Sequence, residues 1–279
     1  MKIDTSEIRR GTRTATTTVV SFLKNKGGVG CTTNAYNFAC WMAMKGYSVL
    51  LLDGDMQGDC TALCQVGFNK PSERQGMYNL LVNGAAFDDV WRGIPGSNYG
   101  NPRGVLYLVP SDEASGKDIA QHLSAQTVRE RLMEVEGRFD LVIIDTSPSA
   151  SELHAGLYLA SNYVVYPTQC QSEPINAIKR SLVYYENSKA YAQAHNLPMA
   201  EILGIMPVMF RGRDMLQHQL KGWLEGKYDE WVMPEIRDLT AWQQAAARRL
   251  PVFIYDPSSN AAKDAVRVYE GFEAVMYGK

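Results

Sequence analysis

The stretch "KNKGGVGCTTN", residues 24–34, decides the fold of this chain. Three glycines within four positions let the backbone turn tightly, so that several N–H groups can point inward at one spot. The apolar run "TVVSFL" at 18–23 precedes the stretch, and the amphipathic run "TTNAYNFACWMAMKG" at 32–46 follows it. This order predicts a strand, a loop and a helix, and the N-terminus of a helix after such a loop favours phosphate groups.

The spacing of residues 25–32 matches the phosphate-binding loop pattern G-x-x-x-x-G-K-[ST] with two changes. Asn25 stands in place of the first glycine, and Cys31 stands in place of the lysine. A glycine-rich turn without a ligand is the alternative, but three glycines and paired threonines would be costly to keep for a plain turn. We therefore predict a P-loop that lacks its usual lysine.

Apolar runs rich in β-branched residues alternate with helical patterns along most of the chain. The predicted strands cover residues 18–23, 48–53, 105–110, 140–145, 163–167 and 201–209. The predicted helices cover residues 32–45, 114–136, 173–195, 213–225, 239–249 and 257–276. Because the strand runs are continuously apolar, they are typical of parallel strands covered on both faces. The fold class is therefore α/β: a single doubly wound, mostly parallel sheet flanked by helices, the P-loop NTPase fold.

The remaining segments predict a simple domain organisation. Residues 1–16 are polar and read as a flexible N-terminal arm, whereas residues 17–279 read as a single P-loop ATPase domain. The stretch at 84–104 is rich in Gly, Pro and Asn and is predicted to be a surface excursion.

The composition of the 279 residues excludes several classes of protein. A net charge of −2 gives no global attraction to DNA or acidic membranes, so any nucleic-acid contact needs a local basic patch. Five cysteines without a CxxC pair indicate neither a disulfide framework nor a zinc knuckle. The N-terminus lacks a signal-peptide pattern and no apolar run is long enough to span a bilayer, which predicts a cytoplasmic protein with no membrane partner.

Polar residues at the ends of the predicted elements suggest a metal site. Thr32 opens the helix after the loop, where its hydroxyl can coordinate Mg²⁺, and Thr33 can bond the α-phosphate. Asp145 ends a buried apolar strand, where an unpaired carboxylate is unfavourable and a Mg²⁺-bound water would explain it. Asp53 ends another strand in the same way. Solvated turn residues or helix caps are the alternative for Asp53, Asp55 and Asp145.

A lysine directly before the glycines, in "KGGVG" at 26–30, resembles the deviant Walker A signature of the ParA/MinD family of P-loop ATPases. Four further stretches are similar to motifs of that family, in the right order: "VLLLDGDMQGDCTA" (49–62), "FDLVIIDTSPS" (139–149), "ASNYVVYPTQCQSEPINAI" (160–178) and "RLPVFIYDPSSNAAKDAVRVYEGF" (249–272). The resemblance covers nearly the whole chain from residue 17 onward and is greatest for the DNA-partitioning ParA branch.

The resemblance implies ATP and Mg²⁺ as cofactors and a homodimer that encloses two nucleotides. Lys26 would reach the phosphates of the partner subunit, and Asp55 would orient the attacking water, which makes these two the catalytic candidates. Thr32, Asp53 and Asp145 are the candidates for holding the metal. The predicted ATP-binding residues are Lys26, Gly27, Gly28, Val29, Gly30, Cys31, Thr32 and Thr33, with the adenine near Met209 and Pro234.

The ParA branch further implies non-specific DNA binding and a ParB-like partner that stimulates hydrolysis. Such a protein would associate with the nucleoid and drive segregation of plasmid or chromosomal DNA. The basic candidates for DNA contact are Arg211, Arg213, Arg237, Arg248 and Arg249. Lysines and arginines on solvated helix faces are the alternative for each of them.

Cys31 leaves three interpretations open. In the first, Cys31 is a small tolerated residue, and Lys26, the loop backbone and Mg²⁺ still hold ATP. In the second, hydrolysis is impaired and the protein is a nucleotide-gated dimer switch. In the third, the thiol is redox-active, favoured by the helix N-terminus, although a thiolate would repel phosphates. A positioning ATPase with a protein cargo is a further alternative, which the sequence does not separate from a partition ATPase.

Overall fold

The structure, a computed structural model, describes residues 16–24, 26–55, 57–66, 75–100, 103–112, 124–147 and 151–278. Apart from Thr16, the predicted N-terminal arm lies outside the described residues. Asn25 and the first part of the helix predicted at 114–136 also lie outside them.

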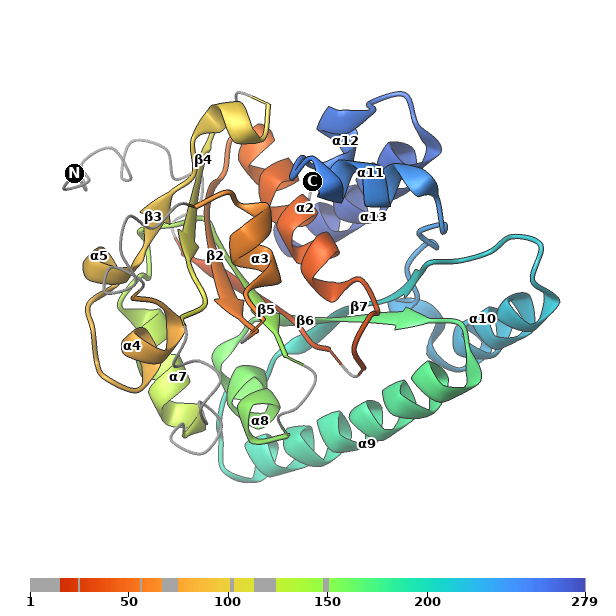
Figure 1. Ribbon diagram of the computed structural model, residues 1–279. Coiled ribbons are helices and arrows are strands. Elements are labelled where there is room, and N and C mark those ends of the chain that lie inside the picture. The colour runs from red at the N-terminus through yellow and green to blue at the C-terminus, as the bar shows by residue number, and fades with distance from the viewer. Residues whose placement is uncertain are drawn as a thin grey trace.

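One sheet of seven strands, in the order β3-β4-β2-β5-β1-β6-β7, runs through the described chain (Figure 1). Its strands are β1 (Thr18–Phe22), β2 (Ser48–Gly54), β3 (Arg92–Gly93), β4 (Val105–Val109), β5 (Leu141–Thr146), β6 (Tyr163–Gln169) and β7 (Glu201–Val208). All neighbouring strands are parallel except the short edge pair β3–β4. The predicted mostly parallel sheet is thereby confirmed.

Helices cover both faces of this sheet (Figure 1). One face carries α2 (Cys31–Met44), α11 (Thr240–Ala247), α12 (Val252–Tyr255) and α13 (Asn260–Tyr277). The other carries α4 (Met77–Leu81), α5 (Phe87–Val90), α7 (Ala125–Met133), α8 (Ser151–Ala160), α9 (Ser172–Ala194) and α10 (Met215–Tyr228). The short α3 (Asp59–Leu63) follows β2. No helix in the described part of the chain combines the length and apolarity needed to cross a bilayer.

Apart from the short β3, the strands are largely apolar because the side chains of each strand are buried in two cores, one on each face of the sheet. In β2, Val49 and Leu51 point into the cluster under α2 and α13, whereas Leu50 and Leu52 point into the cluster on the opposite face. All four side chains are buried. This two-sided burial is the physical reason that the doubly wound fold can be predicted from the sequence.

The segment at 84–104 corrects one prediction. It contains α5, β3 and a 3₁₀ turn at Gly96–Asn98, and its aromatic residues are buried rather than exposed. Trp91 packs edge-on against Phe139, with ring centroids 5.4 Å apart. The segment lies largely at the surface, as predicted, but its aromatic side chains anchor it to the sheet, and the prediction missed α5 and β3.

Strand register brings the polar strand ends together. Phe22 at the end of β1 lies opposite Asp145 of β5, and Asp53 of β2 lies opposite Asp145 from the other side. Because the carboxyl ends of parallel strands share one edge of the sheet, this edge holds the glycine loop and the candidate carboxylates.

Candidate functional site

The glycine loop joins β1 to α2. Gly28 and Gly30 have φ angles of 78° and 66°, in the left-handed region that favours glycine. Gly30 is the N-cap of α2 and has no side chain with which to cap the first turn. An added Cβ at Gly27 or Gly28 would meet no described atom within 4 Å. The loop therefore offers open space and uncapped helix N–H groups, which suit an anion.

Lys26 lies on the outer edge of this loop, away from the buried carboxylates. Its side chain is 40% exposed, and its Nζ atom lies 2.5 Å from Oε2 of Glu173 at the start of α9. The Nε2 atom of Gln169 donates to the Gly28 carbonyl at 3.2 Å and so fixes the same edge. This placement leaves Lys26 at the surface, where it is accessible to a second subunit.

Cys31 turns its side chain into the core. Its Sγ atom lies 3.5 Å from the Phe22 carbonyl oxygen, and the residue belongs to the apolar cluster under α2. Burial, reinforced by the nearby Asp145 carboxylate, raises the pKa of the Cys31 thiol well above its ordinary value. The thiol therefore stays protonated and inaccessible, which contradicts the redox-active interpretation. Only the backbone N–H of Cys31 remains available to a bound phosphate.

Lys24 places an ammonium in the centre of the site. Its Nζ atom lies 2.5 Å from Oδ2 of Asp55 and donates to Oγ1 of Thr32 at 3.3 Å. The Lys24 and Asp55 side chains are only 9% and 6% exposed. Burial by itself lowers the pKa of Lys24, but Asp145 and Asp55 more than offset it, so the pKa is raised and the lysine is charged.

Lys24 was not among the residues predicted for the site. The available signal is that an ionisable residue directly follows the apolar strand run "TVVSFL" at 18–23, at the end of a strand that is buried on both faces. A charge at such a position needs a partner or a ligand.

Thr32 and Asp145 fit the metal role predicted for them. The Thr32 hydroxyl donates to Oδ2 of Asp145 at 2.7 Å. The other carboxylate oxygen, Oδ1, is buried and has no hydrogen-bond partner among the described residues. Burial raises the pKa of Asp145 to about 6, although Lys24 and Thr32 oppose the shift. Hydroxyl and carboxylate oxygens are the ligands that Mg²⁺ prefers, and the unpartnered oxygen is available to bind one.

Asp53 has a different environment. Its Oδ2 atom accepts from the backbone N–H and the hydroxyl of Thr61 at 2.7 and 2.6 Å, and its Oδ1 atom accepts from the Asp55 N–H at 3.2 Å. Burial raises the pKa of Asp53 to about 7 against the effect of Thr61. Because both oxygens are already engaged, the contacts favour a role in holding the turn that carries Asp55, rather than the predicted direct metal contact.

Comparisons with known proteins agree with this geometry. A family model described as an AAA domain matches residues 17–195. The chromosome-partitioning ATPase Soj of Thermus thermophilus is 30% identical over 76% of this chain and 78% of its own length. The chain belongs to the ParA/MinD family of P-loop ATPases. Cell division protein PomZ of Myxococcus xanthus is 29% identical over 87% of this chain and 74% of its own length. ATPase activity is thus a property of the family.

Solved structures show the same fold. The ATP complex of a McdA variant from Cyanothece superposes with a TM-score of 0.75 and 17% identity, over 93% of this chain and 96% of that one. The septum site-determining protein MinD of Pyrococcus horikoshii, complexed with Mg-ADP, superposes with a TM-score of 0.71 and 16% identity, over 94% and 98% of the two chains.

The residues predicted to flank an adenine lie at the end of β7 in this ParA/MinD-family chain. Met209 has a φ of 52°, and its Cε atom would lie 3.6 Å from a Cβ added to Gly30 of the loop. The segment that carries Pro234 runs beside β7, because the Ile236 N–H donates to the Pro207 carbonyl at 2.8 Å. Met209 and Pro234 therefore stay candidates for the adenine side of the site.

The five candidate arginines differ in their surroundings. Arg237 donates through Nε and Nη2 to the buried Asp264 at 2.8 and 2.7 Å, which indicates a structural role. Arg211 pairs with Asp238 at 2.9 Å. Arg213, Arg248 and Arg249 are exposed. Arg211 is exposed as well, but it is already paired with Asp238. Arg213, Arg248 and Arg249 have no ion pair with another described residue and remain the better candidates for contact with DNA.

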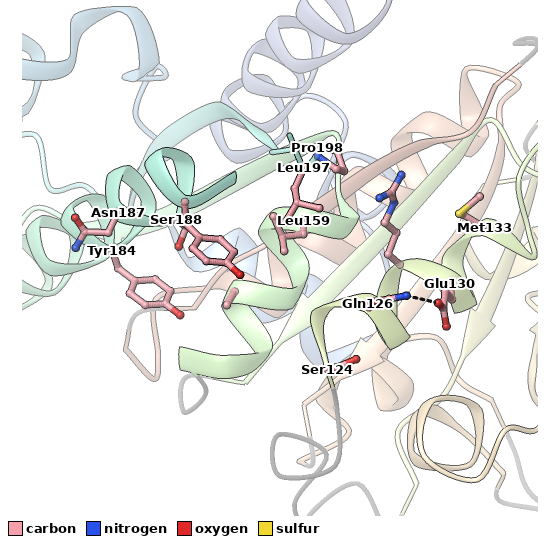
Figure 2. Close-up of a pocket in the computed structure, with 13 residues that line it drawn as sticks. Ser124, Gln126, Glu130, Met133, Leu159, Tyr184, Asn187, Ser188, Leu197 and Pro198 are labelled. Carbon is pink, nitrogen blue, oxygen red and sulfur yellow. Dashed lines mark hydrogen bonds between the residues drawn. The ribbon is translucent and has the colours of Figure 1, made fainter. Parts of the chain in front are cut away.

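A cavity of about 900 Å³ lies elsewhere, between α7, α8, α9 and the connection to β7 (Figure 2). Exposed apolar side chains on its rim include Met133, Tyr191 and Leu197. No residue that lines it belongs to the glycine loop or to the aspartates at the strand ends. This cavity is therefore separate from the glycine loop and from the buried carboxylates at the strand ends.

Proposed function

We propose that this chain is a ParA-like ATPase that binds ATP with Mg²⁺ and forms a nucleotide-sandwich homodimer. In that state it binds DNA non-specifically and drives the segregation of plasmid or chromosomal DNA over the nucleoid. The observation that carries the proposal is the buried cluster of Lys24, Thr32, Asp55 and Asp145 beside the uncapped start of α2. Membership of a family of ATPases supplies the class of substrate.

Each residue has a chemical task in this proposal. The loop N–H groups and the positive end of α2 hold the phosphates. Thr32 and Asp145 hold Mg²⁺, which neutralises phosphate charge when bound. Asp55, already held in place by Lys24 and by the N–H of Gln57 at 3.1 Å, orients the attacking water.

The exposed position of Lys26 supports the proposed dimer. In the single chain, this lysine pairs with the exposed Glu173 and does not reach the buried cluster. In the dimer, Lys26 exchanges Glu173 for the phosphates bound by the partner subunit. Nucleotide binding and dimer formation would thus be coupled through one ion pair at the surface.

We propose DNA as the surface to which the dimer binds, and a ParB-like protein as the partner that stimulates hydrolysis. The name of the Thermus relative, a chromosome-partitioning ATPase, supports partition as the process. PomZ, a cell division protein that matches a larger share of this chain, supports a second candidate, a positioning ATPase with a protein cargo. Both candidates use the same nucleotide cycle, so the first experiment addresses the cycle.

The test is to titrate the purified chain with ATP in Mg²⁺ and in EDTA, and to follow oligomeric state and phosphate release with and without non-specific DNA. We expect Mg²⁺-dependent binding, a monomer-to-dimer shift and DNA binding only with ATP. Binding and dimerisation without phosphate release would identify a nucleotide-gated switch instead. The absence of ATP binding would overturn the proposal.

A further inference from the structure

Position 31 lacks the ammonium that a P-loop normally presents, yet the site does not lack a buried cation. We infer that Lys24 supplies, from the end of β1, the positive charge for the nucleotide phosphates that Cys31 cannot supply from the first turn of α2. This inference rests on the proposed function, because it concerns how the same site binds a nucleotide.

The positions of Cys31 and Lys24 allow the Lys24 ammonium to take the place of the missing P-loop ammonium. Cys31 packs its thiol on the carbonyl of Phe22, only two residues before Lys24. The Lys24 ammonium reaches the hydroxyl of Thr32, the residue directly after Cys31, at 3.3 Å. The ammonium therefore lies beside the first turn of α2 although it comes from a different element.

The charges of the site require such a group. Asp53, Asp55 and Asp145 are all buried at this edge of the sheet, and a nucleotide would bring further negative charge. Lys24 is the one buried lysine or arginine among the described residues. Lys26 does not replace it within the same chain, because Lys26 is held at the surface by Glu173.

The present contacts of Lys24 leave it able to act on a ligand. An ammonium has three N–H donors on a flexible stem. One of them serves Asp55 at 2.5 Å and a second serves Thr32 at 3.3 Å. The third donor suits a phosphate oxygen, so that Lys24 binds the nucleotide while keeping Asp55 in place.

Two other roles of Lys24 predict different behaviour. A purely structural ion pair would affect folding and not affinity. An ammonium that stands in the place of the metal would compete with Mg²⁺, so its removal would strengthen the binding of MgATP. Affinity, measured beside stability, separates these roles from the inferred one.

The experiment measures the Kd for ATP in Mg²⁺ by calorimetry, together with the melting temperature of each nucleotide-free protein. The variants are Lys24→Met, the exchange Lys24→Met/Cys31→Lys, and Lys24→Met/Asp55→Asn, which removes both members of the ion pair in case the first variant does not fold. Lys221→Gln is the matched control, because Lys221 is a half-buried lysine of α10 that pairs with Glu225 and Glu235.

We expect Lys24→Met and the variant without the pair to bind ATP at least about 30-fold more weakly than the parent, the factor that corresponds to about 2 kcal/mol. Lys221→Gln should bind like the parent, and the exchange variant should recover most of the loss. Unchanged or tighter binding by the folded variants without Lys24 would overturn the inference, and so would a folded exchange variant that stays weak. A parent that binds no ATP would instead overturn the proposed function.

Discussion

The Nζ atom of Lys24 lies 2.5 Å from Oδ2 of Asp55, and this buried ion pair joins the end of β1 to the turn after β2. One member is the inferred phosphate ligand and the other is the proposed water-orienting group. A nucleotide whose phosphates contact Lys24 would therefore also affect the position of Asp55. With these two roles, the pair would link nucleotide binding to hydrolysis within one subunit.

Asp55→Asn tests the catalytic half of this link. We expect turnover to fall by at least about 100-fold, because an uncharged amide, with an NH2 donor in place of one oxygen, orients the attacking water less well than a carboxylate. ATP binding should persist, since the phosphate ligands remain. Phosphate release and ATP affinity are the two measurements, with Asp59→Asn, an exposed carboxylate at the start of α3, as the control. Unchanged turnover in Asp55→Asn would remove Asp55 from the mechanism.

Glu173→Ala tests whether Lys26 must leave its surface partner. Without Glu173 the lysine is free before the subunits meet, so we expect half-maximal dimerisation at an ATP concentration about twofold to fivefold lower, a small effect typical of an exposed ion pair. Analytical ultracentrifugation across an ATP titration measures it. Glu186→Ala, an exposed acid farther along α9, is the matched control. Weaker dimerisation in Glu173→Ala would show that Glu173 itself supports the dimer.

His154 in α8 predicts a pH dependence of stability. Burial lowers its pKa from 6.5 to about 4, against the effect of the Ser147 backbone. As the pH falls from about 6.5 to 4, the unfolded chain binds this proton first, so the folded chain loses about 3 kcal/mol of stability through this group.

His154→Leu should remove that part of the pH dependence. The raised pKa values of Asp53 and Asp145, about 7 and about 6, act in the opposite direction, because there the folded chain binds the protons first. Their effects cancel when parent and variant are compared at the same pH. Urea unfolding at pH 7, 5.5 and 4.5 measures the difference, and parallel stability profiles for the two proteins would contradict the assignment.

The exposed arginines predict how the proposed DNA binding depends on salt. Replacing Arg213, Arg248 and Arg249 by Gln should weaken binding to any sequence and reduce the salt slope by up to about 3, about 1 for each lost phosphate contact. Arg237→Gln should instead lower the free energy of unfolding by about 1–2 kcal/mol, since it leaves the buried Asp264 without its main partner. Binding isotherms at several salt concentrations and urea unfolding give both values. An unchanged salt slope in the triple variant would place the DNA surface elsewhere.

The fold was predictable because all of its described strands except the short β3 are buried on both faces, so that each of them is a largely apolar run in the sequence. The prediction missed α8, since "SELHAGLYLA" is short and largely apolar and gives no clear helical period. It also misjudged the segment around Trp91, where burial depends on contact with Phe139, 48 positions farther along the chain. Local composition does not indicate a contact between residues so far apart in the sequence.

The site was predictable only in part, for the same reason. The glycines, Thr32 and Asp145 have local signatures, and the structure brings them together at one edge of the sheet. The role of Lys24 depends on Asp55, 31 positions away, and on the direction that Cys31 takes into the core. Asp53 resembles a metal ligand in sequence, but Thr61 engages its carboxylate once the chain is folded.

The most direct test of the account is a crystal structure of the chain with Mg²⁺ and a non-hydrolysable ATP analogue, in which the distances from the Lys24 ammonium are measured. The account predicts a β- or γ-phosphate oxygen about 2.7–3.2 Å from Lys24 Nζ. An ammonium that still contacts only Asp55 and Thr32, with the phosphates held by the loop backbone alone, would contradict it.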